Sequence, residues 1–146
     1  MTDILNLPGW KAIAARQEGA ECVIEAEYTI QPKSCKKCGV IDRLYRHGVK
    51  STGYRDNPIR GAPVTILATV QRYKCRDCGA TFLQPLGSIQ PNMRMTVRCV
   101  DLIKTQCLRD TFVRIAKHIG CDEKTVRMIA DAHIAALFLL LISAFS

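Results

Sequence analysis

The sequence predicts an α+β protein in which a small β module precedes an all-α module. Two copies of one motif stand in the first half, Cys35-Lys36-Lys37-Cys38-Gly39 and Cys75-Arg76-Asp77-Cys78-Gly79, and a segment with strand character precedes each. After residues 85–91, which hold two prolines and a glycine, the apolar residues take up helical spacing. We therefore expect a zinc-ribbon β module in residues 1–90 and an all-α helix-turn-helix module in residues 91–146.

Four segments build the expected β module. Residues 22–30 alternate in part and carry β-branched and aromatic side chains, so they predict a strand before the first motif. Residues 40–47 are expected to form the strand that leaves this motif. Residues 56–63 are dense in turn formers, and residues 64–73 predict a strand that runs directly into the second motif. A strand that ends in a Cys-x-x-Cys turn is what a zinc ribbon requires.

The two motifs predict one metal site. A Cys-x-x-Cys turn directs two thiolates to one point, and the glycine after it lets the backbone curl around the sulfurs. Two such turns supply four soft ligands in a tetrahedron, the closed coordination of a structural Zn²⁺ ion. His47 is a possible replacement ligand, but four cysteines already fill the site. The expected ligands of one structural zinc ion are Cys35, Cys38, Cys75 and Cys78.

Zinc is expected to supply the stability that a small module lacks. Such a module buries little apolar surface, and a structural zinc contributes on the order of 10 kcal/mol. Residues 1–5 carry an acid and no export signal, which favours a reducing compartment. Free cysteines there are usually small buried apolar residues. We assign that role to Cys22, Cys99, Cys107 and Cys121.

Three helical segments build the expected α module. Thr96 can cap a first helix, whose inward face holds Cys99, Val100, Ile103 and Cys107. A second helix runs from about residue 111 to residue 118, with Phe112, Ile115 and Ala116 inward. Gly120 ends it, Asp122 can cap the next helix, and the buried stripe continues with Val126, Ile129 and Ala130.

Residues 134–145 form an apolar tail without a charge. Twelve helical residues rise about 18 Å, short of the roughly 30 Å of a bilayer core, so we expect no membrane span. The tail is too apolar to lie exposed in water, and we expect it to pack on this domain, on a partner or on a missing continuation of the chain.

The charge is divided unevenly along the chain. Residues 1–30 hold two bases and five acids, a net charge of −3, whereas residues 31–127 hold 19 bases and seven acids, a net charge of +12. A field of this sign attracts a polyanion, and nucleic acid is the commonest one. A basic surface that is merely solvated remains the alternative.

The end of the chain predicts the element that contacts double-stranded DNA. Ala116, Gly120 and Val126 have the spacing of a helix-turn-helix core, which makes residues 122–131 the recognition helix. Its outward side would meet base edges, and nearby bases would hold phosphates. The base-contacting candidates are Lys124, Thr125, Arg127 and Met128, and the phosphate-contacting candidates are Arg109, Arg114 and Lys117.

The order of these motifs resembles the amino-terminal part of bacterial insertion-sequence transposases of the ISL-three family. The resemblance covers about residues 22–133. Besides the two cysteine motifs, it rests on His47-Gly48, Arg55-Asp56-Asn57-Pro58, Gly61-Ala62-Pro63-Val64, Gln71-Arg72-Tyr73-Lys74, Ala80-Thr81-Phe82, Arg94-Met95-Thr96 and Lys124-Thr125-Val126-Arg127.

The resemblance implies that the two modules bind terminal inverted repeats, while a separate domain with an Asp-Asp-Glu triad cuts and joins DNA. Only 13 residues follow His133 and none is acidic, so we expect a truncated transposase that is not an enzyme. It would act in the bacterial cytoplasm, at the nucleoid. Its apolar tail would contact a second copy of the chain or a full-length transposase.

Three other functions are compatible with some of these features. A stand-alone zinc-dependent transcriptional regulator would use the same parts. An electron-transfer protein would hold iron with the same four cysteines, but it has no need of a basic helical module. An enzyme with a thiolate nucleophile would need a histidine and a carboxylate near a cysteine, a pattern that the sequence lacks.

Overall fold

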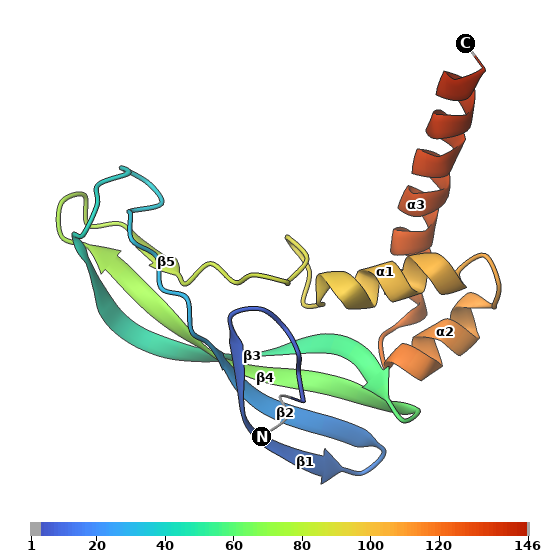
Figure 1. Cartoon of the computed structure of the whole chain (residues 1–146), viewed down its shortest axis with the longest axis horizontal. Helices are drawn as coiled ribbons and strands as arrows, with labels where there is room; N and C mark the ends of the chain where they lie inside the picture. The colour runs from blue at the N-terminus through green and yellow to red at the C-terminus, as the bar shows by residue number, and fades with distance from the viewer. Residues whose placement is uncertain (1–3, 146) are drawn as a thin grey trace.

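The computed structural model describes residues 4–145 and contains one sheet and three helices (Figure 1). Residues 1–3 and 146, the outer ends of the two expected modules, lie outside the described residues. The strands are β1 (Trp10–Glu18), β2 (Glu21–Tyr28), β3 (Leu44–Ile59), β4 (Ala62–Cys75) and β5 (Thr81–Leu83). The helices are α1 (Val97–Gln106), α2 (Phe112–Ile119) and α3 (Glu123–Ala144).

The expected fold class was wrong about the size of the β part. The chain is 39% strand and 28% helix, and the strands form one five-stranded sheet rather than a small zinc ribbon beside an all-α module. The sheet has the order β1-β2-β4-β3, with β5 paired to β4. Along one edge of β4, residues 64–69 pair in parallel with β2 and residues 72–74 pair with β5. The zinc ribbon is therefore the far end of a longer sheet.

The long β3–β4 hairpin explains most of the difference. The strand expected over residues 40–47 begins at Leu44 and continues to Ile59, through part of the segment expected to be a turn. The reversal needs only Arg60 and Gly61, whose φ angles are 51° and 78°. Positive φ at both central residues is the geometry of a tight hairpin turn. The strands expected over residues 22–30 and 64–73 are confirmed as β2 and β4.

One face of the sheet carries a hydrophobic core. Ile24 on β2 and Val64, Ile66 and Ala68 on β4 are almost fully buried there. The chain before β1 and the segment after β5 cover this face, with side chains that include Leu5, Leu7, Leu86 and Ile89. The indole Nε1 of Trp10 donates a hydrogen bond of 2.9 Å to the carbonyl of Gly87, which ties the start of β1 to the segment after β5.

The helices begin where the sequence predicted, and α2 also ends where it predicted. The side chains of Thr96, Thr111 and Asp122 accept hydrogen bonds from backbone amides of the first turns of α1, α2 and α3. Gly120 ends α2 in the left-handed conformation, with φ of 86°. The three helices share a second hydrophobic core, which extends from Met95 to Ala130. Two cores on either side of residue 91 are compatible with the expected boundary, which stays a prediction.

A buried ion pair joins the helices to the sheet. Asp56 on β3 is 2% exposed, and its carboxylate accepts hydrogen bonds from the Thr96 hydroxyl at 2.8 Å and from Arg98 at 2.8 and 2.5 Å. Backbone bonds of 2.9 Å link Arg55 to the residues on each side of Met95. The start of α1 is therefore fixed to the edge of β3.

α3 is longer than the sequence analysis assumed. The recognition helix expected over residues 122–131 and the apolar tail are parts of one helix of 22 residues. Within the described residues, this helix alone is long and apolar enough to meet the composition test for a membrane span. Its first half, however, is packed in the helical core through Val126, Ile129 and Ala130. Only the second half projects from the body (Figure 1), about 18 Å of helix.

The buried ion pair should contribute strongly to stability. Replacing Asp56 by Ala removes the carboxylate that accepts from the Thr96 hydroxyl and pairs with Arg98, so we expect the free energy of unfolding to fall by about 2–3 kcal/mol in urea denaturation. Glu18→Ala breaks only an exposed pair with Arg16 and should cost less than about 1 kcal/mol. Equal effects of the two substitutions would contradict this assignment.

Candidate metal centre

Two matching turns present the four cysteines. In the first turn, the Cys35 amide donates to the Val40 carbonyl and the Gly39 amide donates to the Cys35 carbonyl, both at 2.9 Å. In the second turn, Cys75, Ala80 and Gly79 repeat the pattern at 2.9 and 3.1 Å. Gly39 and Gly79 have φ angles of 75° and 73°, a conformation that favours glycine. The glycine of each motif is therefore needed to close its turn.

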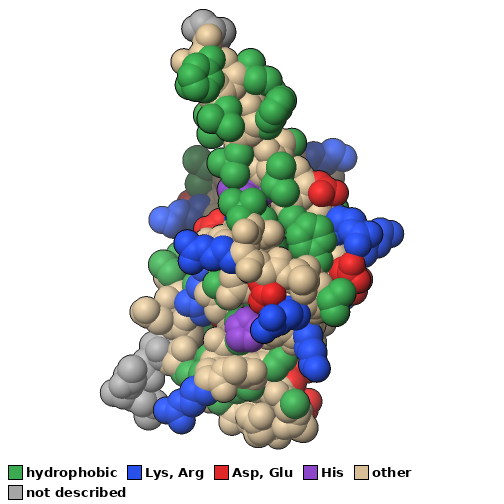
Figure 2. Space-filling view, turned by 90° about the vertical axis from the view of Figure 1, so that its right-hand side faces the viewer, with side chains coloured by type: hydrophobic (Ala, Val, Ile, Leu, Met, Phe, Trp, Pro, Cys, Tyr) green, Lys and Arg blue, Asp and Glu red, His purple; other side chains and the backbone are tan. Residues whose placement is uncertain are grey.

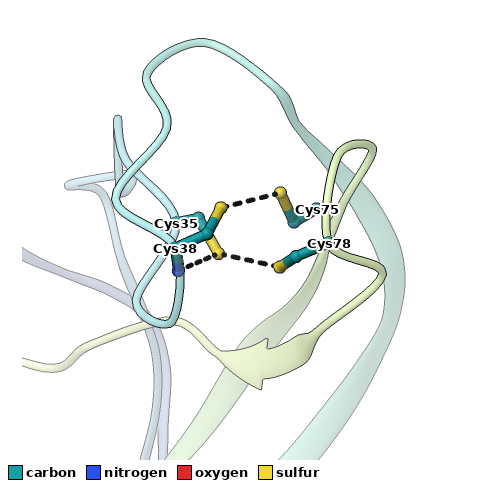
Figure 3. A group of neighbouring side chains, drawn as sticks. All are labelled: Cys35, Cys38, Cys75 and Cys78. Atoms are coloured by element: carbon teal, nitrogen blue, oxygen red, sulfur yellow. Dashed lines mark hydrogen bonds between the residues drawn. The ribbon is translucent and has the colours of Figure 1, made fainter.

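The four sulfurs lie where a single ion can contact all of them (Figure 3). All four Sγ atoms lie within 4.8 Å of one another, with Cys35 to Cys78 at 3.6 Å and Cys38 to Cys75 at 3.7 Å. Zn–S bonds of about 2.3 Å place the sulfurs of a tetrahedron about 3.8 Å apart, whereas a disulfide brings two sulfurs to about 2.05 Å. The distances fit one structural zinc ion held by four cysteines.

Charge repulsion among the sulfurs favours the same conclusion. The Cys38 amide, and then the Lys37 amide, donate to the Cys35 sulfur and lower the pKa of that thiol to about 6. The Val40 amide lowers the pKa of Cys38, but burial and the neighbouring sulfurs outweigh it and raise this pKa to about 12. Four adjacent thiolates therefore need a cation to be stable together, and a divalent ion supplies that charge.

Contacts between the two turns hold them in position. The first turn leads into β3 and the second ends β4, so the antiparallel pairing of Leu44 with Cys75 brings the turns side by side. Arg43 Nε contacts Asp77 Oδ1 at 2.9 Å, and the guanidinium of Arg76 lies 4.6 Å from the centre of the Tyr45 ring. The sequence analysis missed these supports, although all four residues lie in or beside the two motifs.

The remaining cysteines and His47 lie outside the four-sulfur group. His47 is exposed on β3. Cys99 and Cys107 are buried, as expected, and burial raises the pKa of Cys99 to about 12 and also raises the pKa of Cys107. Cys22 and Cys121 are half-buried, so they are less buried than expected, and both lie outside the four-sulfur group.

The candidate DNA contacts lie on the helical part of the molecule. Lys124, Arg127 and Met128 are exposed on the first turns of α3, whereas Thr125 is half-buried and its amide donates to Asp122 at 2.8 Å. The candidates expected to hold phosphates, Arg109, Arg114 and Lys117, are exposed on α2 and the loop before it. Their exposure is compatible with a role in binding, and that role stays a prediction.

Removing the metal should unfold one end of the sheet and leave the rest folded. We expect one zinc per chain by elemental analysis. A chelator, or Cys75→Ser, should release it and increase hydrogen exchange in residues 31–43 and 75–83, because the cysteines are the main buried groups there. The helical core should stay protected, and the control Cys22→Ser should keep its zinc. A metal-free chain with unchanged exchange would contradict the assignment.

Comparison with known proteins supports the metal site. No curated protein and no solved structure matches the chain. Residues 31–78 match the family described as the zinc-finger of transposase IS204/IS1001/IS1096/IS1165. The matched residues include all four cysteines, and the matched domain is a zinc finger rather than a catalytic domain. The expected resemblance is thus confirmed for the zinc ribbon, and the match does not extend to the helices. The chain carries a zinc-binding domain of the ISL3 transposase type.

Proposed function

We propose that this protein binds double-stranded DNA, and that its target is the terminal inverted repeat of an insertion sequence. The observation that carries the proposal is a transposase-type zinc ribbon in the same sheet that holds the helical part of the molecule. Asp56 of β3 and Arg98 of α1 make that connection. A zinc finger of transposases implies DNA as a partner. The protein would act in the bacterial cytoplasm, at the nucleoid. The zinc ribbon would contribute binding and not DNA cleavage, because a zinc ion with four cysteine ligands supplies structure and not catalysis.

The packing of α3 supports its role as the recognition helix. Val126, Ile129 and Ala130 are buried against α1 and α2, which turns Lys124 and Met128 towards solvent on the opposite side. Arg127 lies beside them and contacts Glu123 at 2.6 Å in an exposed pair that costs little to break. A major groove admits a helix, and an arginine can bind guanine through two hydrogen bonds.

Basic side chains surround this helix. Lys and Arg side chains flank the base of the projecting tail on the helical end of the molecule (Figure 2). Lys117 is exposed, and Arg114 is 77% exposed with a weak contact of 3.5 Å to Asp110. Together with Arg109 they can contact phosphates on either side of a groove, which gives affinity without sequence preference.

A stand-alone transcriptional regulator is the second candidate function. It would use the same zinc ribbon and the same helix, so the two proposals differ in the DNA sequence that is bound. Selection from random duplexes at a stated salt concentration distinguishes them, because an inverted repeat from the end of an insertion sequence and a promoter operator are recognisably different products.

Substitutions on α3 should separate specificity from affinity. We expect Arg127→Ala to weaken binding to the selected duplex by about 5- to 150-fold, which corresponds to about 1–3 kcal/mol, and Lys124→Ala to weaken it too. Arg114→Ala should weaken binding to selected and scrambled duplexes equally. Fluorescence anisotropy at fixed salt measures these effects, with circular dichroism to confirm folding. If Arg127→Ala binds the selected duplex as tightly as the parent, α3 is not the recognition helix.

We also propose that the tail of α3 pairs with the tail of a second copy. Ile134, Leu137, Phe138, Leu141 and Ile142 follow the spacing i, i+3, i+4, i+7 and i+8, so they form one stripe, and each is 37–63% exposed. Ala136 and Ser143 lie on the opposite side, flanked by Leu139 and Leu140, which are 66% and 67% exposed, and residues 134–145 have no charge. A partner must therefore offer an equally uncharged apolar stripe, and a second α3 offers one in the geometry of a coiled coil.

Self-association should depend on the stripe alone. Phe138→Glu or Leu141→Glu places a charge in the seam, so we expect a monomer in sedimentation at concentrations where the parent is a dimer. Ala136→Glu adds the same charge on the opposite side and should leave the dimer intact. A monomeric parent chain, or equal effects of all three substitutions, would contradict pairing and leave a full-length transposase as the partner to test.

A further inference from the structure

Two grooves adjoin along the outer edge of β3. The first has a volume of about 560 Å³ and the second a volume of about 600 Å³. Both are lined by Tyr54 of β3 and by Asn92, Met93 and Arg94 of the segment before α1. The two grooves therefore meet at these four residues, and we call them together the edge trough.

The edge trough runs from the zinc ribbon to the recognition helix. At one end it is lined by Lys36, from the first cysteine turn, and by Lys50 of β3. At the other end it is lined by residues 120–122, which join α2 to α3, and by Thr125 and Met128 of α3. A ligand that spans both grooves would contact both parts of the molecule that the proposed function assigns to DNA.

The charges in the edge trough are mostly unpaired and positive. Lys36, Lys50 and Arg94 are exposed and make no ion pair with any residue in the described range 4–145. Arg55 is paired with Glu21 at 2.9 Å. The carboxylate of Asp122, the one acid among the lining residues, accepts a hydrogen bond from the Thr125 amide.

Exposed cations without an ion pair also lie elsewhere within residues 4–145, for example Lys11 and Arg72. Lys36, Lys50 and Arg94 differ from them because all three line the same groove. The trough also offers neutral donors beside its cations. Burial raises the pKa of Tyr54, so its hydroxyl remains protonated and able to donate at physiological pH.

We propose that the edge trough binds the phosphodiester backbone of duplex DNA between the zinc ribbon and α3. Lys36, Lys50 and Arg94 each contact a phosphate, which adds affinity that does not depend on sequence and sets the position of α3 along the duplex. This inference rests on the proposed function and extends it, because none of these three side chains lies on the helices expected to contact DNA.

Three single substitutions that each remove one exposed charge test the edge trough: Lys50→Ala, Arg94→Ala and, as a matched control, Lys11→Ala on β1 at the other edge of the sheet. Binding to a selected and to a scrambled duplex is measured by anisotropy between 50 and 200 mM salt. One lost phosphate contact makes the slope of log affinity against log salt less steep by about 0.9, and weakens binding about eightfold at 100 mM. We expect this for both trough variants on both duplexes, and no change for Lys11→Ala.

The outcomes separate this inference from the proposed function. If Arg127→Ala weakens binding but Lys50→Ala and Arg94→Ala keep the parental slope, the edge trough does not hold the backbone and the proposed function stands. If Lys50→Ala and Arg94→Ala lose no more duplex affinity than Lys11→Ala, the loss of affinity reflects the change in net charge alone and the inference is overturned. If the parent protein binds no duplex, both proposals fail. Zinc content and circular dichroism equal to the parent's confirm that each variant is folded.

Discussion

The repulsion among four cysteine sulfurs is the constraint on which the order of the β3–β4 hairpin depends at its open end. Their mutual distances, all within 4.8 Å, are compatible with full ionisation only around a cation. Once that cation is bound, the turn before β3 and the turn after β4 cannot separate. The ends of a hairpin of 16- and 14-residue strands are thereby fixed at the side away from its tight turn. Zinc thus closes a long β arm that would otherwise be free to fray.

The β3–β4 hairpin extends from the zinc site to the helices and connects the two. Its far half holds the backbone of Arg55 against residues 94–96, and it holds Asp56 against Arg98. These bonds lie on a paired strand rather than on a flexible linker, so the position of α1 relative to the sulfurs is set by strand pairing. A duplex that contacts both ends of the molecule therefore meets a surface that is largely preorganised, which lowers the entropy lost on binding.

Local chemistry made part of this structure predictable from the sequence. The cysteine spacing, the caps Thr96 and Asp122 and the glycine at position 120 each act within a few residues, and each was identified correctly. β1 was missed because it lies at an edge of the sheet and only Trp10 of its residues is buried, so no alternation marks it. The Asp56–Arg98 pair joins residues 42 apart, and no local pattern reveals such a partner.

α3 joins two different surfaces, a basic one on its first turns and an apolar one on its last turns. The turns that carry Lys124 and Arg127 and the turns that carry the exposed apolar stripe belong to one helix without a break, so neither can rotate independently. Any partner that covers Phe138 and Leu141 would therefore also orient Lys124 and Arg127, the residues of the same helix that we propose contact DNA. Pairing of two tails would join two recognition helices at a high effective concentration, and the second DNA contact would follow the first without a further loss of translational freedom. Weak binding by each chain would then become tight binding by the pair. The contact between the two tails would set the distance between the recognition helices, and hence the spacing of the two DNA half-sites that the pair accepts.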